Sequence, residues 1–328
     1  MACCFSCKFC GSHAGKARNH ELTTDECISV ANQLAELGCE RVSLIGGEVF
    51  LRPDWNEIAG TMTSKGIRVS IITNGFLFEE NLIQRLKNAK IESMAVSLDS
   101  VEPIHDKYRQ KGSFQRACKA IDELSESGIP VSVISTLNAE SFRHIDEFYE
   151  WLKPKKIFAW QIQACSPMGN ASNGVDYHFN HYKVIQFVAD HMSDAPFVLG
   201  VADNIGYYTE EEGYIRGNTS GYAFYRGCRA GLSAIGIDSV GNVRGCESMY
   251  DDRFNEGNLR ERSLRDIWED PDAFTYNRGF QKVLLTGKCS RCGFADHCAG
   301  GCRSYNFFTH GRPYEAKFCA KKEDGAEF

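Results

Sequence analysis

The cysteines of this chain constrain its fold more than any other feature. The sequence has 15 cysteines, and ten of them fall into two spaced groups at opposite ends. The first group is a C-x3-C-x2-C run made by Cys3, Cys7 and Cys10. The second group comprises Cys228, Cys246, Cys289, Cys292, Cys298, Cys302 and Cys319. Groups of three and seven cannot be paired evenly, and thiolates are the preferred ligands of iron–sulfur clusters.

Disulfides and structural zinc are the two alternatives for these cysteines. Disulfides require an oxidising compartment, but the opening MACCFSCKFC has neither the charged region nor the apolar core of a secretory signal. Zinc would suit C-x2-C pairs in the C-terminal group. The N-terminal triplet supplies only three thiolates on one short loop, whereas a structural zinc site has four protein ligands. In a four-iron cluster, the same three thiolates leave one iron without a protein ligand. That open iron can bind a substrate or cosubstrate.

Composition indicates an ordinary globular enzyme. A chain of 328 residues forms one large domain or two unequal ones. The net charge of −6 provides no general attraction to nucleic acid. No apolar run reaches the roughly 18–20 residues that cross a bilayer. We therefore expect no nucleic-acid or membrane partner, and the many cysteines predict a reducing cytoplasm.

Helical and strand patterns alternate from Leu22 to about Gly200. Helix-like segments with an apolar stripe are each followed by a short run rich in β-branched residues. The expected strands are residues 42–45, 69–73, 94–98, 131–136, 158–163 and 197–201. Strands that alternate with helices predict a parallel sheet or barrel, in which ligands bind at the carboxyl ends of the strands. The polar and glycine residues at those ends are Gly46, Gly47, Glu48, Asn74, Ser97, Asp99 and the 163–169 segment.

These motifs together resemble the radical S-adenosylmethionine (radical SAM) enzymes. The resemblance is carried by the cysteine triplet, Gly46-Gly47-Glu48, the Ser97-Leu98-Asp99 strand end and His105-Asp106-x-x-Arg109. The seven-cysteine pattern resembles the SPASM extension of that family, which carries two auxiliary clusters. The resemblance implies an α/β fold, with a partial (β/α)6 barrel over residues 1–205 and a small cysteine-rich α+β SPASM domain over 206–328. Because only Met1 and Ala2 precede Cys3, the first barrel strand is expected to be missing or truncated.

The resemblance also implies a cofactor site. Cys3, Cys7 and Cys10 would hold a [4Fe–4S] cluster whose open iron chelates SAM. Glu48, with the backbone of Gly46 and Gly47, would meet the methionine amino group. Other expected SAM-site residues are Asn74, Ser97, Asp99 and Arg109. The alternative for Arg109 is a surface salt bridge with Asp106.

Two auxiliary clusters follow from the SPASM resemblance, which makes three [4Fe–4S] clusters in all. The first would be held by three cysteines only, and the segment 221–227 before them contains no fourth one. We expect that cluster to have an open iron, filled by substrate, water or a distant side chain. Its ligands would be Cys228, Cys246 and Cys302, and those of the second cluster Cys289, Cys292, Cys298 and Cys319.

Two further residues are candidates for a catalytic role near substrate. Cys165 follows an expected strand and faces the presumed pocket, although packing is the more common role of such a thiol. Asp203 follows the strand at 197–201 and could accept a proton. A plain polar loop residue is the equally simple alternative for Asp203.

The resemblance predicts a radical SAM maturase that modifies a ribosomally made peptide by crosslinking, epimerisation, decarboxylation or excision. The implied partners are the precursor peptide, a separate leader-peptide-binding protein, and a flavodoxin or ferredoxin-type reductant. Three alternatives remain open. They are a sulfatase-maturase type that makes formylglycine, a SPASM enzyme acting on a small molecule such as a porphyrin or quinone precursor, and a non-catalytic iron–sulfur electron carrier.

Overall fold

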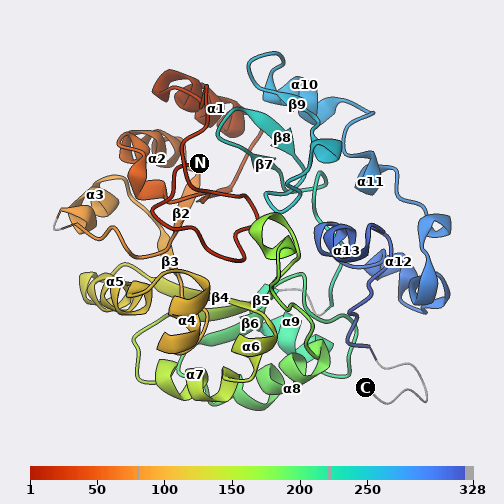
Figure 1. Ribbon diagram of the computed structural model, residues 1–328. Helices are drawn as coiled ribbons and strands as arrows, with labels where there is room; N and C mark the ends of the chain where they lie inside the picture. Colours follow the sequence, from red (N-terminus) through yellow and green to blue (C-terminus); the bar gives the residue numbers. More distant parts are fainter. Residues whose placement is uncertain (80, 221–223, 322–328) are drawn as a thin grey trace.

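The computed structural model describes residues 1–79, 81–220 and 224–321. A six-stranded parallel sheet forms its centre, with the strands in chain order from β1 to β6. The strands are β1 Arg41–Leu44, β2 Arg68–Thr73, β3 Ser93–Ser97, β4 Val131–Leu137, β5 Ala159–Ala164 and β6 Val198–Val201. In Figure 1 the sheet curves, with helices along its outer side and the amino-terminal segment across the opposite side. The partial barrel expected from the sequence is thereby confirmed.

Helices precede, connect and follow the strands on the outside of the sheet. They are α1 Thr24–Glu36, α2 Trp55–Ser64, α3 Leu82–Asn88, α4 Glu102–Tyr108, α5 Ser113–Ser127, α6 Ala139–Phe142, α7 Ile145–Leu152, α8 His181–His191 and α9 Glu212–Ser220. Helix α1 begins with a capping box, in which Thr23 and Glu26 bond each other's backbone N–H groups. Its buried residues Val30, Ala31 and Leu34 recur at the spacing of one helix face and belong to the main core.

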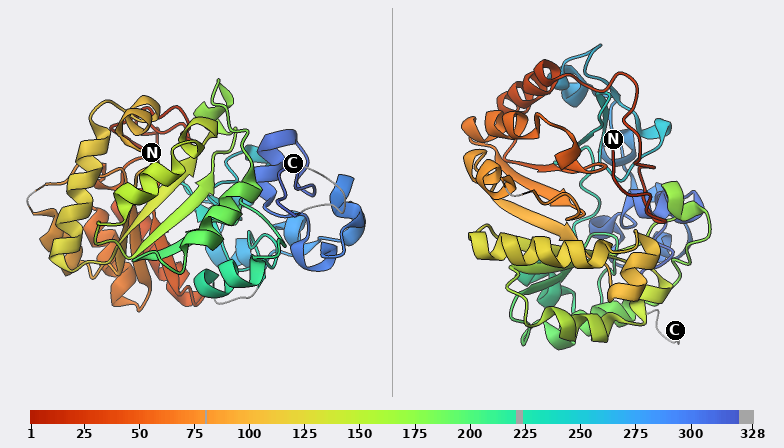
Figure 2. Two further views of the ribbon diagram at one scale, coloured as in Figure 1. Left: turned by 90° about the horizontal axis from the view of Figure 1, so that it is seen from below. Right: turned by 60° about the vertical axis from the view of Figure 1, so that its left-hand side comes forward.

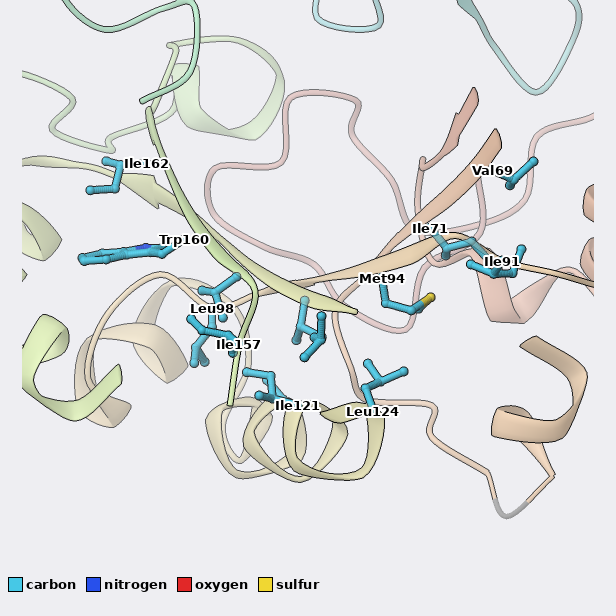
Figure 3. Packing of buried hydrophobic residues seen from close by; sticks show 14 of the residues in the cluster. Val69, Ile71, Ile91, Met94, Leu98, Ile121, Leu124, Ile157, Trp160 and Ile162 are labelled. Carbon is cyan, nitrogen blue, oxygen red and sulfur yellow. The ribbon is translucent and has the colours of Figure 1, made fainter. Parts of the chain in front are cut away.

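The core lies between the sheet and this layer of helices. Strand β4 alternates buried and half-buried side chains along its whole length, as one covered face requires. Figure 3 shows Met94 and Leu98 above Ile121 and Leu124 of α5. Leu124 is fully buried, and burial of a side chain of that size contributes about 2–3 kcal/mol.

No named strand precedes Cys3 within the described residues. Ala2 forms only an isolated β-bridge with Gly15. The amino-terminal segment is nevertheless ordered against the sheet, because the backbone N–H of Cys3 donates to the carbonyl of Gly15 at 2.8 Å.

The C-terminal third lies beside the last strands of the sheet (Figure 2). It contains a small antiparallel sheet of β7 Gly236–Ile237, β8 Asn242–Arg244 and β9 Gly257–Asn258. Its helices are α10 Leu264–Glu269, α11 Thr275–Arg278, α12 Ala295–Cys298 and α13 Arg303–His310. Leu264, Phe274 and Tyr305 belong to the same continuous core as the barrel, so the boundary at residues 205 and 206 stays a prediction. In the described part of the chain, no helix has the length and apolar character needed to cross a membrane.

Candidate active site and cysteine clusters

The amino-terminal cysteine loop is fixed to the carboxyl end of β1 by a close backbone contact. The N–H of Glu48 donates to the carbonyl of Ala2 at 2.8 Å. A Cβ added at Gly47 would lie 1.9 Å from that carbonyl oxygen, far inside van der Waals contact. Glycine is therefore required at position 47, where two backbones meet directly beside Cys3.

A second segment, after β5, holds the other end of the cysteine loop. The side-chain amide of Asn170 donates to the carbonyl of Cys7 at 2.9 Å, and its backbone N–H donates to the carbonyl of Cys10 at 2.9 Å. Gly169 packs so closely that a Cβ there would lie 2.2 Å from the carbonyl oxygen of Cys10. Asn170 was not predicted from the sequence, because the expected strand-end segment ended at Gly169. The available signal was Gly169, a glycine in the segment that follows β5.

Replacement of Asn170 by alanine is expected to loosen the cysteine loop. It removes one buried hydrogen bond to Cys7, which costs about 1–2 kcal/mol of local stability. We expect Asn170→Ala to retain less iron after reconstitution and to cleave SAM several-fold more slowly, measured as 5′-deoxyadenosine. Asn170→Asp, which still accepts from His13 but cannot donate, separates the donor role from side-chain size. A normal iron content and rate in Asn170→Ala would contradict the clamp.

Glu48 is a buried carboxylate next to the cysteine loop. It is 4% exposed and accepts hydrogen bonds from the Thr73 hydroxyl at 2.8 Å and the Asn74 backbone N–H at 2.9 Å. Burial raises the pKa of Glu48, and these hydrogen bonds oppose that rise. The side-chain amide of Asn74 lies 3.4 Å from the Cys4 sulfur and 3.9 Å from the Cys3 sulfur. Glu48, Asn74 and the cysteine loop therefore share one edge of the sheet.

Asp99 and Arg109 form a buried ion pair at the same edge. Arg109 Nε and Nη2 donate to the two Asp99 carboxylate oxygens at 2.5 and 3.0 Å, and Asp99 also accepts from the backbone N–H of Thr136. Burial alone would raise the pKa of Asp99, but the charge of Arg109, with hydrogen bonds from His105 and Arg109, holds it well below its usual range. The guanidinium carbon lies 5.2 Å from the ring centre of Phe9 in the cysteine loop. Arg109 is thus tied to Asp99 and the loop.

The alternative salt bridge between Arg109 and Asp106 is wrong. The Asp106 carboxylate instead accepts from the backbone N–H groups of Gly112 and Phe114, at the start of α5. This is a helix cap, which satisfies donors that have no partner inside the helix. Ser97 is the half-buried last residue of β3.

Four C-terminal cysteines line one cavity. Its walls include Tyr207, Tyr208, Ala295 and Ala316, and its sulfurs come from Cys289, Cys292, Cys298 and Cys319. The surrounding side chains are mainly apolar, which suits a buried cluster. The predicted grouping of these four residues therefore fits a single [4Fe–4S] cluster.

The other three C-terminal cysteines are half-buried, and Cys302 lies close enough to Cys228 and Cys246 to interact electrostatically with both. Cys228 and Cys246 pack against the small apolar cluster of Ala230, Met249 and Phe254. Cys302 caps the start of α13, and its backbone N–H donates to the Tyr207 hydroxyl at 3.0 Å. Residues 221–223 of the segment before Cys228 lie outside the described part. Among the described residues, these cysteines included, no three His, Cys, Asp or Glu side chains are close enough to hold one metal ion. The ligands of a four-iron cube stand further apart.

Comparison with known proteins decides the family. The sequence model of the Radical SAM superfamily matches residues 1–152, and that of the SPASM iron-sulfur cluster-binding domain matches residues 228–293. The chain is a radical SAM enzyme with a C-terminal SPASM domain. The non-catalytic electron carrier is thereby set aside. The cofactors of this radical SAM enzyme are SAM and the [4Fe–4S] clusters of these two domains.

Curated relatives of this radical SAM enzyme fall into more than one activity. The chain is 28% identical over 321 residues to the AdoMet-dependent heme synthase of Methanosarcina barkeri, covering 94% of the chain and 90% of the relative. It is also 28% identical over 314 residues to mycofactocin maturase MftC of Mycobacterium tuberculosis, covering 94% and 77%. Both matches span nearly the whole chain, so identity alone does not choose between them.

Solved structures agree with the fold. SuiB of Streptococcus suis bound to S-adenosylmethionine superposes with a TM-score of 0.77 at 20% identity, over 96% of this chain and 73% of SuiB. Native anSMEcpe with bound AdoMet and Cp18Cys peptide gives a TM-score of 0.72 at 18% identity, over 97% and 90%. At such identities the likeness establishes the fold alone.

Cys165 and Asp203 occupy different surroundings in this radical SAM enzyme. Cys165 is 1% exposed and packs with Ala171 and Val175. Asp203 lies on the surface after β6, with a carboxylate oxygen 3.6 Å from Arg216. Catalysis by either residue stays a prediction.

Replacement of Cys165 by alanine tests whether this residue has a packing role or a catalytic role. Burial raises the pKa of Cys165 to about 12, so the thiol is protonated and unreactive at neutral pH. We expect Cys165→Ala to keep the wild-type rate of 5′-deoxyadenosine formation and to lose about 1 kcal/mol of stability in denaturant unfolding. A loss of product modification with SAM cleavage intact would instead assign Cys165 a role on substrate.

Proposed function

We propose that this radical SAM enzyme modifies a ribosomally made peptide. When bound, SAM and its reduced cluster supply a 5′-deoxyadenosyl radical that takes a hydrogen atom from substrate. Cys3, Cys7 and Cys10 would hold that cluster, Glu48 with the backbone of Gly46 and Gly47 would meet the methionine amino group, and Asn74 would lie in the same SAM site. The protein's own task is to align the target C–H bond and to exclude water.

The observation that carries this proposal is the charge pairing beside the SAM site. Arg109 is bound to Asp99, and Lys107 donates to Glu140 at 2.5 Å, where the Tyr108 hydroxyl also donates. A substrate with several carboxylates needs cations that are free to bind it. Because Arg109 and Lys107 are already paired, neither is free to bind such a substrate. This favours a peptide of low charge, and the match to mycofactocin maturase MftC supports the same class.

A porphyrin precursor is the second candidate substrate. It is favoured by the match to the heme synthase of Methanosarcina barkeri, which spans 90% of that relative. Formylglycine formation has weaker support, since the likeness to anSMEcpe concerns the fold.

Deuterium transfer distinguishes these substrates. Short peptides encoded beside the gene would be made with deuterated residues and incubated anaerobically with SAM, enzyme and a flavodoxin or chemical reductant. We expect deuterium in 5′-deoxyadenosine and a changed peptide. With the unlabelled peptide in a parallel reaction, a loss of two hydrogens indicates a crosslink, no mass change indicates epimerisation, and a larger loss indicates excision or decarboxylation. Turnover of a heme-precursor porphyrin, with none of any neighbouring peptide, would overturn the proposal.

The cluster count and ligation are part of the proposal. Three [4Fe–4S] clusters would be present, and the one held by Cys228, Cys246 and Cys302 would have an open iron. Mössbauer and EPR spectra with and without peptide test this ligation. Complete protein ligation, unchanged by peptide, would remove the open iron but not the proposed substrate class. A separate leader-peptide-binding protein is the expected partner, and its addition should lower the peptide concentration needed for turnover.

A further inference from the structure

Arg303 is a charged side chain that the reaction does not use, yet it is fully buried. It is 0% exposed and is the first residue of α13, directly after Cys302. Its Nη1 donates to the carbonyls of Ala299 and Pro313, and its Nε lies 3.4 Å from the carbonyl of Tyr276. The guanidinium therefore closes the loop that joins Cys298 to Cys302.

The surroundings of Arg303 differ from those of the other buried arginines. Arg109, Arg216 and Arg244 each contact a buried carboxylate, on Asp99, Glu212 and Asp238. Among the described residues, Arg303 forms no ion pair, and its partners are carbonyls and the rings of Phe280 and Tyr314. A buried charge without a counter-charge costs several kcal/mol, which neutral dipoles only partly offset.

Arg303 also lies between the two groups of C-terminal cysteines. The rings of Phe280 and Tyr314 pack with the apolar cluster that contains Cys289 and Cys298. Tyr276 packs with the other cluster, together with Cys228 and Cys246. Residues that contact Arg303 therefore pack with both groups of cysteines, whose thiolates would be anionic when they hold iron.

We propose that Arg303 is the shared counter-charge of the SPASM clusters and raises their reduction potentials. A four-iron cluster with thiolate ligands is anionic and gains one further negative charge when it accepts an electron. A cation in a dry, low-dielectric site stabilises the reduced form more than the oxidised form. Arg303 is thus a positioning and tuning residue that touches neither SAM nor substrate. The inference holds for a peptide or a porphyrin substrate alike.

The test is an EPR-monitored reductive titration of the SPASM clusters alone. A parent protein with Cys3→Ala, Cys7→Ala and Cys10→Ala removes the SAM cluster signal. Arg303→Gln and Arg303→Met remove the charge, and Arg303→Lys keeps it. Arg85→Met is the matched control, because Arg85 also donates to a carbonyl and stacks on Trp55, but it lies on α3 at the opposite side of the molecule (Figure 1).

We expect more negative midpoint potentials in both neutral variants, parent-like values in Arg85→Met, and a smaller shift in Arg303→Lys than in Arg303→Gln. Parent-like iron content and potentials in Arg303→Gln would overturn the proposal. If the neutral variants fail to hold iron, retention by Arg303→Lys supports the need for charge. Equal iron loss in Arg303→Lys would overturn the proposal, because the planar geometry of the guanidinium, and not its charge, would then be essential.

Discussion

Asp99→Asn is expected to lower the free energy of unfolding by about 3–5 kcal/mol, because it leaves a buried guanidinium without its counter-charge. Arg109 donates to both carboxylate oxygens of Asp99, and the two side chains are 10% and 3% exposed. Asp99 also accepts from the backbone N–H of Thr136 on the next strand, and the amide oxygen of the variant can still accept that bond, so the expected loss comes from the missing charge. Denaturant unfolding of the cluster-free protein at neutral pH measures the effect.

The matched control is Glu150→Gln, which breaks an exposed ion pair with Lys153. Exposed pairs contribute about 0–1 kcal/mol, so this variant should unfold close to wild type. Equal stability losses in the two variants would contradict the role assigned to burial.

The pH dependence of the Asp99 effect follows from its lowered pKa. A carboxyl group with a lowered pKa in the folded state stabilises the protein above its unfolded value, near 3.9. That contribution is lost as the pH falls through the lower folded value. We therefore expect the stability difference between wild type and Asp99→Asn to be constant from about pH 8 to pH 5 and to shrink only in stronger acid.

The barrel could be predicted from sequence because its strands are short apolar runs between amphipathic helices. Strands β2 and β4 begin and end within a residue of the expected 69–73 and 131–136. Helix α4 was not predicted, since His105 is its only buried residue and it has no apolar stripe. In the C-terminal third, elements such as β7 and α11 have only 2 and 4 residues. Such lengths leave no periodicity to detect.

The site was predictable where the sequence carries a motif and not where chain segments meet in space. Sequence motifs with recognisable spacing contain the cysteines, Gly47 and Glu48. Asn170 reaches Cys7 across 163 positions of sequence, which no spacing reveals. The partner of Arg109 was also ambiguous, because Asp106 is nearer in sequence than Asp99. The structure shows Asp99 as the partner, because the Asp106 carboxylate already accepts hydrogen bonds from backbone N–H groups at the start of α5.

Gly47→Ala is expected to reduce 5′-deoxyadenosine formation by about 100-fold, because it must displace the segment that begins the cysteine loop. The added Cβ would lie 1.9 Å from the carbonyl oxygen and 2.6 Å from the carbonyl carbon of Ala2. Both neighbours are backbone atoms, which cannot rotate away as a side chain would. Cys3 follows Ala2 directly, so a shift of about 1 Å there misplaces a cluster ligand and the bound SAM together. The measurements are iron content after anaerobic reconstitution and product formation under excess reductant.

Gly60→Ala is the matched control, since Gly60 lies inside α2 and an added Cβ meets no atom within 4 Å. Alanine in a helix interior stabilises by about 0.5–1 kcal/mol relative to glycine, so this variant should keep wild-type activity. Restoration of Gly47→Ala by excess SAM would mean that only SAM affinity had changed. Because the Cβ strikes the chain beside Cys3 and leaves the Glu48 carboxylate in place, we expect a lower kcat that excess SAM does not restore.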